Sequence, residues 1–177
     1  TCTNKFSTMK NGDGLTIYGD SGSVKFPYLL GDKRVRYEYK DWSKTIVLAT
    51  PTGGVAYTSS KFYKSKADFK KLQSVPLKFG SNGATSLDLI PLLAFEMLGL
   101  QVKPVFGMKG RGPSRVAFER GETTIDYQTT SSYKSKVTPM VKEGKAVPLF
   151  TWGVVNSSGT IERDPTFPNL PHWAEYY

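Results

Sequence analysis

Leu77 to Leu100, LKFGSNGATSLDLIPLLAFEMLGL, holds a strand, a turn and a helix in one uninterrupted run. Leu77–Phe79 is expected to be a short strand, and the small and polar residues 80–86 allow tight backbone turns. Gly99 stands where a left-handed C-terminal helix cap is expected. The apolar residues between the turn and this cap recur at helical spacing: Leu87, Ile90, Leu93, Ala94, Met97 and Leu98. The stretch therefore predicts a strand that leads through a loop directly into a helix.

The loop of this stretch is the best anion site that the sequence offers. A helix N-terminus presents unpaired backbone N–H groups and the positive end of the helix dipole. Ser81, Thr85 and Ser86 add hydroxyl donors. On the loop alone, the simpler interpretation is that Ser86 caps the helix and the glycines form an ordinary turn. The loop is neither a Walker A motif nor a GxGxxG fingerprint, so nucleotide binding is disfavoured.

The composition of the 177 residues, 38% of them hydrophobic, predicts a globular protein with a real core. No apolar run approaches the ~18 residues of a transmembrane helix. The N-terminus shows no charged-then-apolar signal segment, so we expect that any export signal has already been removed. The formal net charge of +9 fits nucleic acid, an anionic surface, an anionic small ligand or plain solubility, and does not choose among them.

Residues suited to metal binding or catalysis are scarce. The chain has one cysteine, Cys2, and one histidine, His172, which rules out an internal disulfide and makes a metal centre improbable. No Ser/His/Asp set and no paired carboxylates are legible. We therefore expect no cofactor, no metal and no catalytic residues, and we interpret the chain as a binding protein rather than an enzyme.

Strands alternate with helices along the chain, which predicts an α/β fold with parallel pairing through right-handed crossovers. Beside Leu77–Phe79, the strongest expected strands are Val102–Phe106, Ile125–Tyr127 and Ala146–Phe150. Ser65 with Asp68 forms a capping-box-like pair before a short helix. Strands are also expected at Leu15–Tyr18, Ile46–Thr50 and 53–58, helices at 86–98, 114–120 and 136–142, and an exposed connection at residues 31–45.

Four segments, in their order along the chain, carry a resemblance to a known family. They are DGLTI (13–17), VKPVFGMKG (102–110), VAFERGETTID (116–126) and DPTFPNLP (164–171). Together they resemble the Bug-type periplasmic receptors of tripartite tricarboxylate transporters. Within the second segment, Phe106 stands where the family often has a tyrosine.

This resemblance implies a periplasmic-binding-protein type II-like architecture, with two α/β lobes around a small anionic ligand. It places residues 1–50 in a partial first lobe, residues 58–147 in a complete second lobe, and residues 151–177 back in the first lobe. The family's opening strand and closing helices have no counterpart, so we expect a fragment. An incomplete lobe exposes core residues, so we also expect self-association.

The resemblance further implies an extracytoplasmic solute receptor of the periplasm, which delivers a carboxylate-bearing ligand to membrane transporter subunits and binds no nucleic acid. The alternative is a basic α/β module that binds nucleic acid or an anionic surface without a transport role. The implied ligand donors are in the loop: Ser81, Asn82, Gly83, Ala84 and Thr85. Lys109 either attracts the anion or is simply solvated, and Asp126 either accepts a ligand hydroxyl or amine or is structural.

Overall fold

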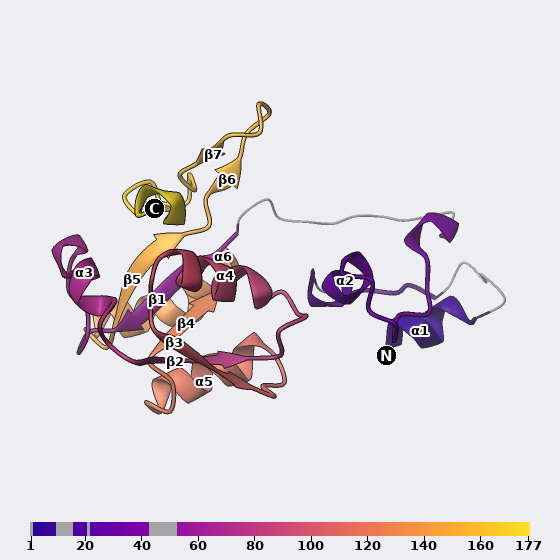
Figure 1. Ribbon diagram of the computed structural model, residues 1–177, viewed down its shortest axis with the longest axis horizontal. Helices are drawn as coiled ribbons and strands as arrows, with labels where there is room; N and C mark the ends of the chain where they lie inside the picture. The colour runs from indigo at the N-terminus through magenta and orange to yellow at the C-terminus, as the bar shows by residue number, and fades with distance from the viewer. Residues whose placement is uncertain (1, 10–15, 21, 43–52) are drawn as a thin grey trace.

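A computed structural model describes residues 2–9, 16–20, 22–42 and 53–177. Its largest feature is a five-stranded sheet with the strand order β3-β2-β4-β1-β5 (Figure 1). The bounds of the strands are Val55–Ser59 for β1, Leu77–Ser81 for β2, Val102–Phe106 for β3, Ile125–Gln128 for β4 and Ala146–Thr151 for β5. The four strongest predicted strands and the extended piece at 53–58 are thus confirmed, and the fold is α/β.

The pairing of the strands is mixed rather than all parallel. β2 runs parallel to both β3 and β4, whereas β1 is antiparallel to β4 and β5. The strands that follow a helix, β2 to β5, therefore share one direction, as the alternating pattern predicts. No helix among the described residues connects an earlier strand of this sheet to β1, so the rule for right-handed crossovers does not determine the direction of β1.

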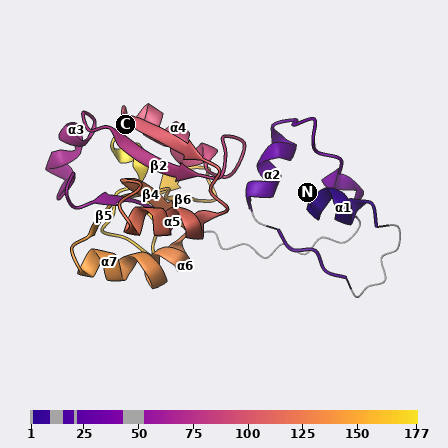
Figure 2. The ribbon, with the colours of Figure 1, turned by 90° about the horizontal axis from the view of Figure 1, so that it is seen from below.

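Two helical layers cover the sheet. α4 (Leu89–Met97) lies on one face, and α5 (Arg111–Glu119) lies on the other with α7 (Thr138–Lys142) (Figure 2). Shorter elements are η2 (Lys66–Asp68), α3 (Phe69–Leu72), α6 (Thr130–Ser132) and the π-helical turn Tyr133–Val137. No described helix is long and apolar enough to cross a membrane.

Side chains alternate between the two faces of the sheet, as the strand period of two requires. Phe79 and Tyr127 belong to the core cluster on the α4 side, which also holds Phe95 and Phe150. Tyr57 packs with Phe118 on the α5 side. Each face of the sheet is thus buried against a helix, which fixes the register of the strands and the positions of the loops at their ends.

The predicted helix ends are partly confirmed. The capping box of Ser65 and Asp68 is present. Gly99 has φ +66°, and the Leu100 N–H donates to the Phe95 carbonyl at 2.9 Å, the pairing of a Schellman C-cap. The start of α4 differs, because the N-cap position belongs to Asp88 rather than Ser86.

The N-terminal residues form a small aromatic unit with α1 (Cys2–Ser7), α2 (Gly22–Leu29) and η1 (Tyr39–Asp41). The strand predicted at 15–18 is wrong for Thr16–Tyr18, which are not in a strand. The Tyr18 ring stacks on Phe6 instead. The exposed connection predicted at 31–45 is wrong at Tyr37, which is buried among other aromatic rings. Leu15 and the predicted strand 46–50 lie outside the described residues.

The C-terminal segment contacts the sheet through its last turn. It contains β6 (Val154–Val155), β7 (Ile161–Glu162) and η4 (Trp173–Glu175). The Tyr176 ring stacks on Phe69 with centroids 4.3 Å apart, and Thr151 pairs with His172 in a parallel bridge. The division of the chain into residues 1–50, 58–147 and 151–177 of two lobes remains a prediction.

Acid should loosen this tail, because Glu175 holds it together. Its carboxylate accepts hydrogen bonds from Arg163 at 2.6 and 2.7 Å and from the His172 N–H at 3.0 Å. Arg163 is the main cause that lowers the pKa of Glu175 from 4.5 to about 2. A depressed carboxyl pKa contributes stability that is present above pH 4.5 and is lost as the pH falls towards 2.

The His172 amide resonance should report this transition in an NMR titration. We expect its chemical shift to change as the pH falls through about 2 in the native chain. The Glu175→Gln variant should show no such titration, because an amide carries no proton-linked charge. An identical titration in both proteins would contradict the role of Glu175.

Candidate functional site

The loop that follows β2 lies at the carboxyl end of the parallel strands, where ligands of α/β proteins gather. Ser81 is fully buried, whereas Ala84 and Thr85 are exposed. The Met108 N–H donates to the Ser81 carbonyl at 3.1 Å, which brings the loop after β3 alongside. The predicted loop residues 81–85 therefore lie next to the 107–110 loop.

Hydrogen bonds within the loop fix its shape. The Gly83 N–H donates to Ser81 Oγ at 3.1 Å, and Ser86 Oγ donates to the Gly83 carbonyl at 2.7 Å. The Asn82 N–H donates to Asp88 Oδ2 at 2.7 Å. Gly83 has φ +154°, a conformation that favours glycine. The protein's own Asp88 therefore takes one of the backbone donors that the sequence assigned to a ligand.

Other donors of the loop face no protein acceptor. The N–H groups of Ala84, Thr85 and Leu87 make no hydrogen bond with any described residue, and neither does the Thr85 hydroxyl. Asn82 Oδ1 is buried and also has no described partner. The loop thus presents neutral donors to solvent on a framework that internal hydrogen bonds hold in place.

Arg111, the first residue of α5, lies beneath this loop. Its side chain is 16% exposed, and Nη1 donates to the Gly80 carbonyl at 2.8 Å and to Asp88 Oδ1 at 3.3 Å. The guanidinium stacks over the rings of Phe79 and Tyr127, at 4.9 and 4.3 Å from their centroids. Arg111 is therefore largely buried, although the glycines and the proline beside it in the sequence suggest a solvated surface residue.

Asp126 lies in β4 and is fully buried. One carboxylate oxygen forms an ion pair with Arg111, and the other accepts hydrogen bonds from the Tyr57 hydroxyl at 2.6 Å and from Gln128 Nε2 at 3.1 Å. Burial raises the pKa of Tyr57, so this hydroxyl remains a donor. The structure places Asp126 beneath the loop with both oxygens engaged, and any direct contact with a ligand remains a prediction.

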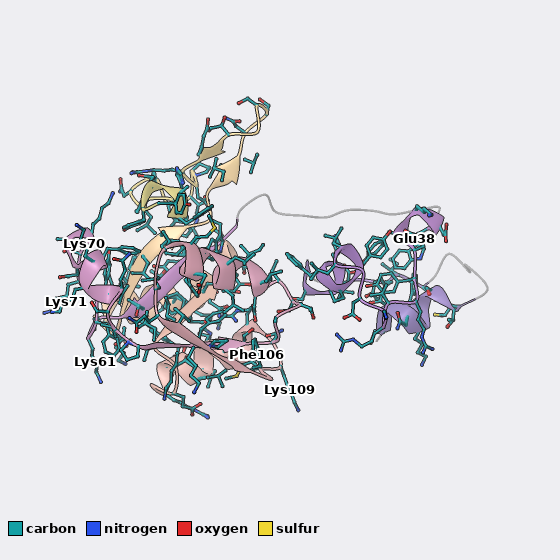
Figure 3. All side chains as sticks on the ribbon, in the orientation of Figure 1. Glu38, Lys61, Lys70, Lys71, Phe106 and Lys109 are labelled. Carbon is teal, nitrogen blue, oxygen red and sulfur yellow. The ribbon has the colours of Figure 1, made fainter. Side chains whose placement is uncertain are left out.

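Lys109 and Phe106 lie beside the loop on the solvent side. Lys109 is exposed and extends away from the domain, and no described residue forms an ion pair with it (Figure 3). Phe106, the last residue of β3, is 53% exposed. Lys109 is therefore placed to attract an anion at range, with little to hold it in one position.

Two hollows in the surface lie away from this loop. One of about 510 Å³ is lined by the first residues of β2 and β3, Leu77 and Val102, at the opposite end of the strands. The other, about 280 Å³, lies between Tyr63 and Tyr176. No group of three or more metal-ligating side chains occurs in the described ranges.

Sequence reasoning found the loop but missed Asp88 and Arg111. Asp88 looked like one more polar residue at a helix start. Arg111 stands in GRGP (110–113), which reads as an exposed loop. The sequence signal that could have revealed this pair was an arginine at a helix start, Arg111, together with an aspartate in the next predicted strand, Asp126.

Comparison with solved structures identifies the fold. MatC from Rhodopseudomonas palustris with bound malate matches at a TM-score of 0.50 and 20% identity, over 71% of this chain and 40% of that one. Rpa4515 of R. palustris with adipate matches at a TM-score of 0.53 and 19% identity, over the same shares. The periplasmic binding protein BugD matches at 0.50 and 18%, over 71% of this chain and 42% of that one.

These matches confirm the predicted resemblance at the level of the fold. The chain has the α/β fold of part of the Bug-type solute-binding proteins and spans about 40% of the length of these structures. A scan of protein-family models and a search of curated protein sequences both return no match. Function must therefore be argued from the loop and its surroundings.

Proposed function

We propose that the chain is part of an extracytoplasmic solute receptor that binds a small carboxylate-bearing ligand at the Ser81–Thr85 loop and delivers it to a membrane transporter. One observation carries this proposal. Ala84, Thr85 and Leu87 present unpaired N–H groups at the carboxyl end of parallel strands, within the fold of solute-binding proteins. The name of BugD as a periplasmic binding protein supports the location.

Neutral donors suit a receptor that must release its ligand. Several N–H groups and a hydroxyl solvate a carboxylate without a rigid ion pair, and the helix N-terminus adds a favourable dipole. Asp88 already takes the Asn82 N–H, so the ligand must bind the donors further along the loop, from Ala84 to Leu87. In this arrangement Ser81 and Asn82 shape the loop while Thr85 contacts the ligand.

The ligand class is a small dicarboxylate. MatC carries malate and Rpa4515 carries adipate, and both share the fold of this chain. We place the loop in the cleft face of a second lobe (58–147), with the other carboxylate of the ligand reaching towards a first lobe. Lys109 attracts the ligand over a distance rather than contacting it.

A module that binds a polyanion is the second candidate, and a group of exposed lysines around α3 favours it. The group consists of Lys61, Lys64, Lys66, Lys70 and Lys71, and none of them forms an ion pair with a described residue. Figure 3 labels Lys61, Lys70 and Lys71. Surface lysines are usually only solvated, and Lys66 of this group lies over the Tyr176 ring, 5.2 Å from its centroid. The solute receptor explains both the fold and the open donors, so we prefer it.

Calorimetry with malate, adipate and citrate tests the proposal through Thr85. Thr85→Val keeps the shape of the side chain and removes one hydroxyl donor. A hydrogen bond to a charged group contributes about 1.5–3 kcal/mol, so the affinity should fall about tenfold or more. Gly83→Val should cost more, because a side chain strains the backbone at φ +154° and obstructs the approach of a ligand.

Lys109→Ala is the matched control for these two variants. It should change mainly the dependence of the affinity on salt, because an exposed charge acts at range and is screened. Unchanged affinities in both loop variants would place the ligand elsewhere. Retention on nucleic acid with no heat from any carboxylate would favour the polyanion module.

A further inference from the structure

The guanidinium of Arg111 has no donor left for a ligand. Arginine carries five N–H groups, and this one makes five contacts with protein acceptors. Nε donates to the Tyr127 carbonyl at 3.3 Å, Nη1 to Gly80 and Asp88, and Nη2 to Asp126 and to the Tyr127 carbonyl at 3.0 Å. Any effect of Arg111 on a ligand must therefore pass through the groups that it holds.

These groups bracket the ligand loop. The Gly80 carbonyl lies immediately before Ser81, and Asp88 lies at the far end of the loop, at the N-cap of α4. The other two acceptors, Asp126 and the Tyr127 carbonyl, belong to the neighbouring strand β4. One side chain thus joins both ends of the loop to the centre of the sheet.

We propose that Arg111 is a positioning residue, which sets the orientation of the open N–H groups of Ala84 and Thr85 without touching the ligand. Asp88 transmits its effect, because one oxygen of Asp88 binds Arg111 and the other accepts the Asn82 N–H. That the loop binds a carboxylate ligand rests on the proposed function. The positioning itself is a property of the free protein.

Lysine cannot replace Arg111 in this role. An ammonium group keeps the positive charge but has three donors on a flexible stem, so it cannot span Gly80, Asp88 and β4 together. Arg111→Lys therefore removes the link while leaving a cation near the two buried carboxylates. Arg115→Lys is the matched control, since Arg115 lies one turn along α5, is 19% exposed compared with 16% for Arg111, and forms its ion pair with Glu119 of the same helix.

Amide hydrogen exchange of the free protein measures the link directly. In Arg111→Lys we expect the Asn82 and Gly83 amides to exchange about tenfold faster or more, because a charge-assisted contact is lost. The amides of β1 should keep their native rates, and Arg115→Lys should leave both sets unchanged. Asp88→Asn breaks the same link from its other end and should accelerate the exchange of the same loop amides. This second variant tests the proposal even if Arg111→Lys does not fold.

The double variant Arg111→Lys/Asp88→Asn separates positioning from general stability. If Arg111 acts through Asp88, the loop amides of the double variant exchange no faster than those of the more affected single variant. Loop amides that keep their native rates in Arg111→Lys, or that accelerate together with β1, would overturn the proposal.

A ligand titration of the same variants distinguishes the two proposals. With adipate as the probe, Arg111→Lys should weaken binding about tenfold, since the donors of Ala84 and Thr85 lose their orientation. Should the native chain bind no dicarboxylate while the exchange result holds, the proposed function fails and the positioning by Arg111 stands. Adipate binding of native affinity in Arg111→Lys would overturn the positioning and leave the function intact.

Discussion

Replacing Asp126 by alanine should destabilise the folded protein by about 3–5 kcal/mol, because the substitution removes one of the two carboxylates that pair with the largely buried Arg111. Arg111 is 16% exposed, and the desolvation by burial that lowers its pKa is opposed by the negative charge of Asp88. Without Asp126, the Tyr57 hydroxyl and the Gln128 amide also lose a buried acceptor. The Tyr57 hydroxyl and one Gln128 N–H, each left without this acceptor, therefore add to the cost of the lost ion pair.

Urea denaturation measures this loss of stability. Glu122→Ala is the control, because Glu122 meets Arg120 at 3.9 Å on the surface, where an ion pair contributes less than about 1 kcal/mol. A cost below about 1 kcal/mol for Asp126→Ala would show that the network is not held by this carboxylate.

Phe79→Ala is the second large effect, with an expected loss of about 3–5 kcal/mol for a fully buried aromatic side chain. The Phe79 ring meets Phe95 edge to face at 5.6 Å and stacks on Tyr127 at 6.3 Å, so a cavity would open in the centre of the α4-side core. The same ring supports the Arg111 guanidinium at 4.9 Å. The variant should therefore also loosen the ligand loop.

The matched control for Phe79→Ala is Phe106→Ala. Phe106 is the last residue of β3 and pairs with Ser81, two residues after Phe79 in the neighbouring strand β2. Phe106 is 53% exposed, and surface substitutions usually stay within about 0.5 kcal/mol. Thermal unfolding of both variants, followed by circular dichroism, gives the comparison. Equal losses would contradict the assignment of Phe79 to the core.

The sequence allowed the sheet strands and the loop to be predicted because their signals are local. Leu77–Leu100 carries its strand, turn and helix within 24 residues, and Gly99 marks the helix end by its own conformational freedom. The direction of β1 was not predictable in this way. It depends on pairing with β4 and β5, and the paired residues lie 67 to 96 positions apart along the chain.

The charged core beneath the loop was missed for a related reason. Arg111 is buried by residues from β2, the N-cap of α4 and β4, which lie 15 to 31 positions away along the chain. Its own neighbours, two glycines and a proline, indicate an exposed turn. Asp88 likewise became recognisable only when its two oxygens could be assigned to Asn82 and Arg111.

An NMR titration of the chain with adipate, followed through its backbone amides, tests the central claim most directly. The account predicts one saturable process in which the Ala84, Thr85 and Leu87 amides shift most, while the Lys70 and Lys71 amides stay unchanged. Gly83→Val should abolish these shifts. Shifts confined to the lysine-rich segment, or no shift of the loop amides at adipate concentrations well above about 1 mM, which corresponds to roughly 4 kcal/mol of binding, would contradict it.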